Sequence, residues 1–465
     1  MKTTIRHLAL LVPVFAIASL PAAAQKQTPP EGAPAKAFTV PAHETYTLPN
    51  GLIVTLVPYG NIPKVTVSVA VDAGRIDQGS AHGGVANITG DLLKEGTSTL
   101  SSGQLADAAA RMGSTLDVEV SEDQTTAALD VLSEFGPDAA RLLAGVLEHP
   151  LLPEQELPRL KNNALRQIAV NASRPQTIAE VRFRKILYGS HPYGTVMPSE
   201  EEINQIAIQD VKDYFAANFN PRRSHLYVAG KFDSAAVKKA IADGFGAWEQ
   251  KGEAKTKTAP TPQASRVLDV TDRPGAPQST LILGLPVIPP GSPDAIQLEV
   301  ANALLGGAFN SRIIANIREQ KGYAYSPFSQ ISSRYHDSYW SENADVTTQF
   351  TGASIKEILF EINRLGTEPP SAREVKGTQN YLSGLFVIRN SNRGALIGQL
   401  QNVDFQGLGE DYLKTYVARV NAVTADDIQK VTARYLKPRD LTIVVVGDKS
   451  KIGDELAPYQ SGNPL

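Results

Sequence analysis

Cysteine is absent from the 465-residue sequence, which excludes a disulfide framework, a thiol nucleophile and a lipid-anchoring cysteine. Histidine is scarce: the seven that occur are never three or four residues apart, so no helix offers a ready pair of imidazole metal ligands. A Gly-x-Ser-x-Gly elbow, a Ser-x-x-Lys motif and a P-loop are also missing. These absences argue against catalysis through a covalent enzyme intermediate, and the chain alone shows no zinc site.

The sequence also lacks a strong excess of either charge and a long apolar run. A net charge of -3 with 20% charged residues, both signs interspersed, predicts neither a nucleic-acid partner nor an anionic membrane surface. The apolar run Leu8–Ala18 is shorter than the roughly 20 residues of a membrane-spanning helix. Because Lys2 and Arg6 precede this run and small residues follow it, we expect a signal peptide at 1–24. The mature protein is expected to be periplasmic or secreted, without a membrane span.

The length exceeds what one compact core accommodates, so at least two lobes are expected. Residues 25–43 begin rich in Pro, Ala, Gln and Lys, a composition typical of a flexible tether. A second polar stretch, 251–264, is the best candidate for a linker. These boundaries predict an N-terminal domain at 44–250 and a C-terminal domain at 265–465.

The two predicted domains look like copies of one unit. Asp210 opens a helical pattern that is followed by Pro221-Arg222 and an apolar strand, and Asp427 opens the same pattern before Pro438-Arg439. The offset between the two copies is the same for the aspartates, the turns and the strands. A common local solution reached twice is the alternative, but a constant offset across helix, turn and strand favours duplication.

Strand signals indicate antiparallel sheets. Alternating apolar residues from Tyr46 to Ala73 surround the turn signal Asn50-Gly51, and two further strands are predicted at 115–120 and 125–131. The expected fold class is therefore α+β, with two homologous lobes, each a mainly antiparallel sheet covered by helices. Repeated parallel βαβ units, as in a periplasmic solute-binding protein, fit this pattern poorly.

A segment of the first half carries a family resemblance. Gly84–Thr97 resembles the helix that bears the inverted zinc motif His-x-x-Glu-His in peptidase family M16, which includes insulin-degrading enzyme, pitrilysin and mitochondrial processing peptidase. In that frame Asn87 and Asp91 replace the two histidines, Gly90 replaces the catalytic glutamate, and Gln167 replaces the third ligand, a glutamate. The resemblance implies the clamshell arrangement of the LuxS/MPP-like fold, with a degenerate zinc site.

Residue chemistry explains why this degeneration abolishes a zinc site. Catalytic zinc needs three imidazole or carboxylate ligands and an open position for water. Asn87 and Gln167 are neutral and weak ligands, Asp91 alone cannot hold the ion, and Gly90 cannot act as a general base. We therefore expect this segment to be an amphipathic helix of the core, with no catalytic role. No bound cofactor is expected for this chain.

The second half keeps the corresponding family signature. Leu304–Arg312 contains a Gly-Gly loop and Ser-Arg, and Ile317–Ser326 contains Arg-Glu-x-x-Gly followed by Ala-Tyr. By resemblance, Arg318 and Tyr325 are the pair that reaches toward the zinc ion of the other half, and Gly306 and Gly307 contact substrate. An arginine fork suits a peptide carbonyl, and a neutral phenol can stabilise a developing oxyanion. The alternative is a solvated arginine and a packing tyrosine.

His191-Pro192-Tyr193-Gly194 also matches a family pattern, with an expected structural role in a turn before a helix that begins near Ser199. Lost zinc ligands beside a kept Arg/Tyr pair imply a non-zinc subunit of a heteromeric metallopeptidase, which is inactive alone. Its partner would be an M16 paralogue with the His-x-x-Glu-His motif, which holds the zinc, and the substrate would be a peptide. The alternative is a catalytically inactive scaffold or peptide-holding protein of the same fold.

Overall fold

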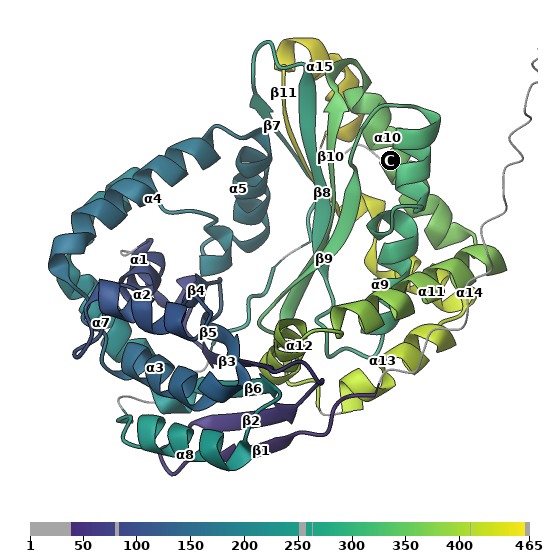
Figure 1. Ribbon diagram of the computed structural model, residues 1–465. Coiled ribbons are helices and arrows are strands. Elements are labelled where there is room, and N and C mark those ends of the chain that lie inside the picture. Colours follow the sequence, from purple (N-terminus) through teal and green to yellow (C-terminus); the bar gives the residue numbers. More distant parts are fainter. Residues whose placement is uncertain (1–38, 80–82, 251–256, 263, 410, 461–465) are drawn as a thin grey trace, which may run out of the picture. The chain divides into compact units, whose positions relative to one another are not determined.

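Figure 1 shows the computed structural model of the chain. It describes residues 39–79, 83–250, 257–262, 264–409 and 411–460. The predicted signal peptide lies outside these residues, as do the predicted tether up to residue 38 and part of the predicted linker. The domain boundaries stay a prediction. No helix in the described ranges is both long enough and apolar enough to cross a membrane.

The first half of the chain builds one sheet, which within the described residues has six strands in the order β1-β2-β6-β3-β5-β4. They are β1 (Glu44–Thr47), β2 (Ile53–Pro58), β3 (Lys64–Val71), β4 (Asp117–Val120), β5 (Thr125–Leu132) and β6 (Ser224–Gly230). Of these strands, β2 and β6 pair in parallel, and the other neighbours are antiparallel. The predicted Asn50-Gly51 turn joins β1 to β2, and Gly51 has a φ of 93°, which favours glycine. The strands predicted at 115–120 and 125–131 are confirmed as β4 and β5.

The second half builds a sheet with the same topology. Within the described residues its five strands have the order β7-β11-β8-β10-β9. They are β7 (Val267–Asp272), β8 (Gln278–Val287), β9 (Phe328–Arg334), β10 (Asp337–Thr347) and β11 (Thr442–Gly447). β7 and β11 pair in parallel and the rest are antiparallel, so the order repeats that of β2-β6-β3-β5-β4. This match confirms the predicted duplication and the mainly antiparallel sheets.

The helices repeat in the same way. In the first half they are α1 (Val85–Leu92), α2 (Ser102–Arg111), α3 (Gly136–Glu148), α4 (Leu157–Ala172), α5 (Pro175–Tyr188), α6 (Glu200–Gln205), α7 (Ile208–Asn218) and α8 (Ser234–Phe245). In the second half they are α9 (Ala295–Asn302), α10 (Thr351–Thr367), α11 (Ala372–Arg389), α12 (Arg393–Gln406), α13 (Asp411–Ala422), α14 (Ala425–Tyr435) and α15 (Lys449–Leu456). Helix α14 has the same length as α7, and its two ends are displaced along the chain by the same offset as the repeated sequence pattern. Capping boxes begin several helices; at α11, Ser371 pairs with Glu374.

The two halves exchange one helix each. Helix α5, from the first half, packs on β8 and β11 of the second sheet, and α12 packs on β3 and β6 of the first sheet. The ring of Phe183 on α5 meets Tyr339 edge to face at 5.4 Å between ring centroids. On the other side, Tyr227 donates a hydrogen bond of 2.6 Å to Asp404 on α12. The sequence halves are therefore interlocked.

Charged side chains from both halves meet next to α5. The carboxylate of Glu122 lies 2.9 Å from Arg184, 3.1 Å from Arg75 and 3.9 Å from Arg334. Burial alone would raise the pKa of Glu122, but the three arginines outweigh it and lower the pKa to about 2. This cluster joins the β4–β5 turn to the end of β9.

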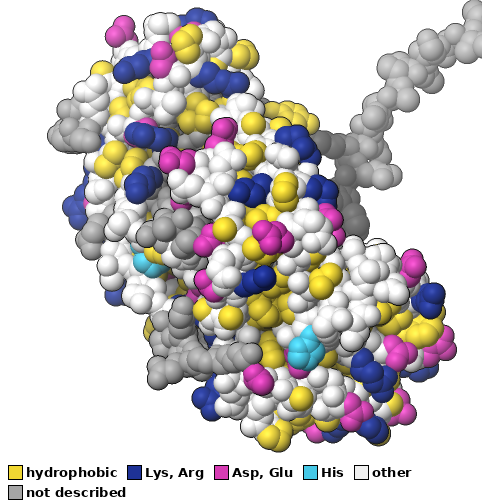
Figure 2. All heavy atoms as spheres, turned by 90° about the vertical axis from the view of Figure 1, so that its left-hand side faces the viewer, with side chains coloured by type: hydrophobic (Ala, Val, Ile, Leu, Met, Phe, Trp, Pro, Cys, Tyr) yellow, Lys and Arg dark blue, Asp and Glu magenta, His cyan; other side chains and the backbone are white. Residues whose placement is uncertain are grey.

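The predicted turn at His191-Pro192-Tyr193-Gly194 is confirmed as structural. Tyr193 is fully buried, and its hydroxyl donates a hydrogen bond of 2.5 Å to Asp123 and accepts one of 3.0 Å from the backbone of Tyr335. Helix α6 begins directly after its cap, Ser199, as expected. On the face shown in Figure 2, basic and acidic side chains are interspersed.

Candidate functional site

The degenerate zinc positions on α1 do not form a ligand set. The side chain of Asn87 is exposed, Gly90 is buried, and Asp91 pairs with Lys94 at 2.8 Å on the same helix. Gln167 lies exposed on α4, which contacts α1, and donates a hydrogen bond of 3.1 Å to Asn171. No group of three His, Cys, Asp or Glu side chains in the described part of the chain could hold a metal ion. The residues at these positions do not fit zinc.

The packing around Gly90 also leaves no room for a catalytic side chain. A Cβ atom added at Gly90 would lie 2.5 Å from a methyl group of Val120 and 3.7 Å from Val118, both on β4. Real Cβ contacts are essentially never that short, so a glutamate here would require β4 side chains to move. By resemblance Gly90 stands where the family has its general base, and the contact with Val120 and Val118 on β4 disfavours a larger side chain there.

The Gly-Gly segment of the second half follows α9 as a π-helical turn, η6 (Ala303–Gly307). A Cβ atom added at Gly306 would lie 2.6 Å from the hydroxyl of Ser329 and 2.7 Å from the carboxylate of Glu342. One added at Gly307 would lie 2.8 Å from the amide nitrogen of Asn302. Both positions need glycine because the neighbouring side chains approach so closely. Gly306 is buried and Gly307 is exposed, so only Gly307 is accessible to a substrate.

The predicted pair, Arg318 and Tyr325, is brought together. Arg318 lies on a second π-helical segment, η7 (Ile314–Gln320), and its guanidinium carbon is 5.4 Å from the centre of the Tyr325 ring. The Tyr325 side chain is 79% exposed, and its hydroxyl has no hydrogen-bond partner in the described part of the chain. Segments of π-helix occur often at functional sites. The two side chains form a partly exposed cation and an exposed phenol at one place on the second lobe.

Sequence reasoning assigned no role to Phe309, which completes this arrangement. The guanidinium carbon of Arg318 lies 4.7 Å from the centre of the Phe309 ring, closer than to Tyr325. Phe309 is 68% exposed, although it is apolar. Cation–π contacts at exposed sites contribute about 0.5–1 kcal/mol each, which restrains the arginine. An ion pair of 3.1 Å with Glu319 restrains it further.

A second residue that the sequence did not indicate is Glu342, on β10 below Gly306. It is fully buried, and no described protein group donates a hydrogen bond to either carboxylate oxygen. Burial raises the pKa of Glu342 well above the ordinary value of 4.5. The pattern of this buried strand predicts an apolar residue at position 342. A glutamate at an apolar position of a strand is the sequence signal that could have pointed to Glu342.

This arrangement can bind and polarise a substrate. Arg318 offers cationic donors for a carbonyl or carboxylate, and Tyr325 offers a neutral hydroxyl donor. The carboxylate beside the pair, Glu319, is engaged by the guanidinium of Arg318. Donors of this kind can stabilise negative charge that develops on a bound carbonyl oxygen.

Two segments of the chain, one in each half, match models of one peptidase family. Residues 55–197 match the family model for insulinase (peptidase family M16), and residues 205–382 match the model for the peptidase M16 inactive domain. The chain is 25% identical over 417 residues to the uncharacterized zinc protease YmxG of Bacillus subtilis, covering 86% of this chain and 97% of that protein. It is 23% identical over 375 residues to the non-peptidase homolog YmxG of Helicobacter pylori, covering 79% of this chain and 85% of that protein.

Solved structures share the fold. The peptidase M16 inactive domain from Pseudomonas fluorescens superposes with a TM-score of 0.80 at 24% identity, over 87% of this chain and 98% of that one. A protease from Helicobacter pylori superposes with a TM-score of 0.82 at 20% identity, over 88% and 100%. A family model matches each half of the chain, so the protein belongs to peptidase family M16, and inactive-type relatives are among its homologues.

Proposed function

We propose that this protein is the non-zinc subunit of a heteromeric M16-type metallopeptidase. In this proposal Arg318 and Tyr325 bind the peptide and stabilise the transition state at the zinc ion of a partner subunit. The partner is a paralogue that carries His-x-x-Glu-His and is exported to the same compartment, the periplasm or the exterior. The chain alone is inactive.

One observation carries the proposal. The tyrosine is exposed and the partly exposed arginine lies next to it, whereas the described residues include no group of three His, Cys, Asp or Glu side chains that could hold a metal ion. The Tyr325 ring contacts Arg318, and its exposed hydroxyl forms no hydrogen bond within the described residues, so the hydroxyl is available to a ligand. The pair is therefore best explained by a ligand or partner that supplies the remaining chemistry.

The division of labour follows from the chemistry of hydrolysis. The partner's zinc site would supply the activated water, and this chain would supply donors for the carbonyl oxygen as it becomes an oxyanion. Removing one preorganised donor of this kind lowers the rate by about 10²–10³. Small or unfolded peptides are the expected substrates, and cleavage of a stably folded protein by the complex would contradict this part of the proposal.

The test is peptide hydrolysis by the purified mature chain, by its zinc-motif paralogue and by their mixture, with metal analysis of each protein. Activity is expected only in the mixture. Arg318→Ala and Tyr325→Phe should each lower kcat by about 10²–10³ without loss of complex formation. Arg439→Ala is a matched control, because that arginine is exposed and lies outside the Gly-Gly segment. Zinc and activity in this chain alone would overturn the proposal.

A scaffold or peptide-holding protein of the same fold is the second candidate. The relative from Helicobacter pylori named a non-peptidase homolog favours it. In that case the Arg318/Tyr325 pair no longer has a catalytic role. Two results would support the scaffold: no peptide hydrolysis in a mixture with any exported paralogue, or hydrolysis that both substitutions leave unchanged.

Phe309 offers a finer discrimination between these two functions. Phe309→Ala removes the ring nearest to the guanidinium but leaves Arg318 itself in place. In a complementing subunit, kcat of the mixture should fall, by less than in Arg318→Ala, and Phe309→Tyr should restore it because the ring returns. In a scaffold, neither substitution should change peptide turnover.

A further inference from the structure

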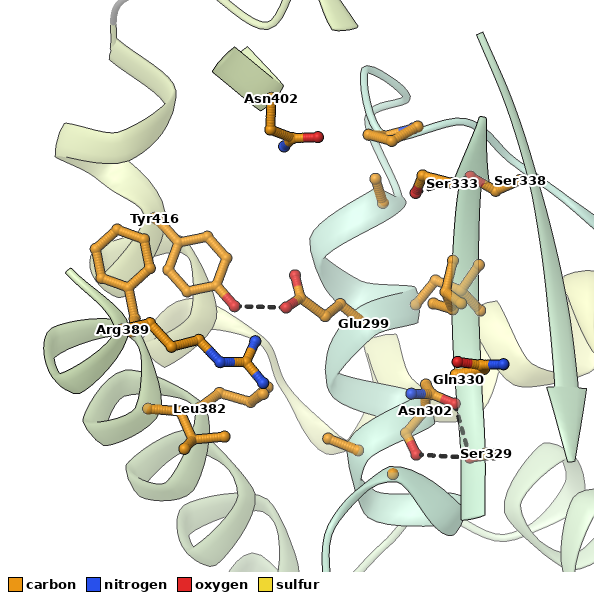
Figure 3. A pocket seen from close by; sticks show the side chains of 18 of the residues that line it. Glu299, Asn302, Ser329, Gln330, Ser333, Ser338, Leu382, Arg389, Asn402 and Tyr416 are labelled. Carbon is orange, nitrogen blue, oxygen red and sulfur yellow. Dashed lines mark hydrogen bonds between the residues drawn. The ribbon is translucent and has the colours of Figure 1, made fainter. Parts of the chain in front are cut away.

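The second lobe contains a cavity of about 550 Å³ that the proposed function does not use. It is bounded by α9, α11, α12, α13 and the edge strand β9, and Figure 3 shows its lining. Its volume lies within the range typical of small-molecule sites. Gly307 is among its lining residues, but neither Arg318 nor Tyr325 lines it.

A carboxylate faces this cavity from α9. Glu299 accepts a hydrogen bond of 2.6 Å from the hydroxyl of Tyr416, through one of its two oxygens. The Tyr416 ring is held by stacking on Phe386, with ring centroids 4.4 Å apart. Burial raises the pKa of Glu299, and the Tyr416 hydrogen bond and the charge of Arg389 oppose this rise only in part. A cation beside the second oxygen would offset the cost of burying the carboxylate.

The cation already present does not reach the carboxylate. Arg389, at the end of α11, lines the cavity, and Figure 3 shows its guanidinium extending toward Glu299. Within the described residues it forms no side-chain hydrogen bond, and its charge acts on Glu299 without a direct ion pair. The cavity thus presents a free guanidinium and a carboxylate with one open oxygen, separated by a gap.

The rest of the described lining is neutral, partly polar and partly apolar. Asn402, Gln399 and Gln330 contribute amide groups, and Leu382 and Leu385 form an apolar side. Such a mixture suits a small molecule with a polar frame and a short side chain. Among the described lining residues there is no third charged group, so the two charges define the recognition.

The position of the cavity follows from the duplication. Helix α9 has the same length as α1 and takes the corresponding place in the second half of the chain. Helix α1 packs on the edge strand β4 and carries three of the four degenerate zinc positions, and α9 packs on the edge strand β9 and carries Glu299. The second lobe therefore has a charged pocket beside the edge strand β9, which corresponds to β4 of the first lobe.

We propose that this cavity binds a small zwitterion, a free amino acid or a dipeptide, with the amino group on Glu299 and the carboxylate on Arg389. A simple anion would pair with the guanidinium but face the carboxylate, and a simple cation would face the guanidinium. A molecule with both charges satisfies both groups at once. The proposal is independent of the Arg318/Tyr325 function, since it concerns other residues and needs no partner subunit.

The experiment is calorimetric titration of the purified chain with free amino acids and dipeptides that bear small, aliphatic and aromatic side chains. For each binder, the N-acetylated and the C-amidated forms are titrated too. We expect binding of the zwitterion and a loss of at least about tenfold in affinity for either blocked form, as removal of one charge-assisted hydrogen bond predicts. Preference for the amino acid or for the dipeptide identifies the source of the ligand.

Variants assign the binding to this cavity. Glu299→Gln should weaken binding of the zwitterion at least about tenfold but leave the affinity for the N-acetylated form unchanged. Arg389→Gln should also weaken binding of the zwitterion at least about tenfold but leave the affinity for the C-amidated form unchanged. Arg439→Gln, which removes an exposed arginine that does not line the cavity, should have no effect. Absence of binding by every zwitterion, equal binding of blocked forms, or unchanged binding in Arg389→Gln would each overturn the proposal.

Discussion

Glu342 is expected to make the folded protein less stable as the pH rises. The side chain is fully buried on β10, and no described group donates a hydrogen bond to either oxygen. Because burial raises its pKa well above 4.5, the folded protein keeps this carboxyl protonated at pH values where the unfolded chain has released the proton. The folded state then binds more protons than the unfolded state, so stability decreases with pH in that window.

The size of this effect follows from proton linkage. For one group the free energy of unfolding falls by about 1.4 kcal/mol per pH unit, from pH 4.5 up to the pKa of Glu342 in the folded protein. Glu342→Gln keeps the shape of the side chain and removes the proton equilibrium. The free energy of unfolding of the variant, relative to that of the native protein, should therefore rise by about 1.4 kcal/mol per pH unit inside this window.

The assay is urea unfolding at a series of pH values, followed by tryptophan fluorescence. The chain has two tryptophans, and the buried Trp340 lies on the same strand as Glu342. Glu154→Gln, at an exposed position in the first half, is the matched control and should leave the pH profile unchanged. If the difference between Glu342→Gln and the native protein stays constant from pH 5 to pH 8, the reasoning about the buried carboxyl is wrong.

Three further predictions concern close packing and buried charge. Gly306→Ala should lower the free energy of unfolding in urea by about 1–3 kcal/mol, because its Cβ would lie 2.6 Å from the hydroxyl of Ser329. The control is Gly377→Ala on α11: a Cβ there would have no atom within 4 Å, so the variant should be more stable by up to about 1 kcal/mol. Glu122→Gln should lower the free energy of unfolding by about 3 kcal/mol at neutral pH and by almost nothing at pH 2. The pKa of Glu122 is about 2 in the folded protein, so the stability that its ionised form contributes is lost as the pH falls through that value. An equal loss of stability at both pH values would contradict this prediction. Gly90→Ala should destabilise the first lobe, and Val120→Ala should relieve that cost in a double-mutant cycle, with a coupling of at least about 1 kcal/mol.

Much of the fold could be predicted from local pattern. The constant offset between the two copies of the helix, turn and strand pattern indicated a duplicated unit, and the two sheets share one strand order. Apolar alternation marked the strands because side chains on a strand point to opposite faces with a period of two. The exchange of α5 and α12 was not predicted, since an amphipathic helix shows that one face is buried but not which sheet covers it.

The site divides in the same way. The resemblance indicated Arg318 and Tyr325, and the structure places them 5.4 Å apart as measured from the guanidinium carbon to the ring centre. It did not indicate that the Phe309 ring also contacts the guanidinium, nor that Glu342 lies buried against Gly306. Contacts between residues this far apart in sequence depend on the path of the backbone, which local pattern does not describe.

The sequence by itself led to the prediction that this chain lacks the family's zinc site. Asn87, Gly90, Asp91 and Gln167 do not supply the three ligands and general base that catalytic zinc requires, and no packing changes the chemistry of a side chain. Only the tertiary structure decided which groups meet. Glu299 and Arg389 lie far apart in the chain and face one cavity because α9 and α11 pack around it. Residue type sets what a group can do, and the fold sets what it can reach.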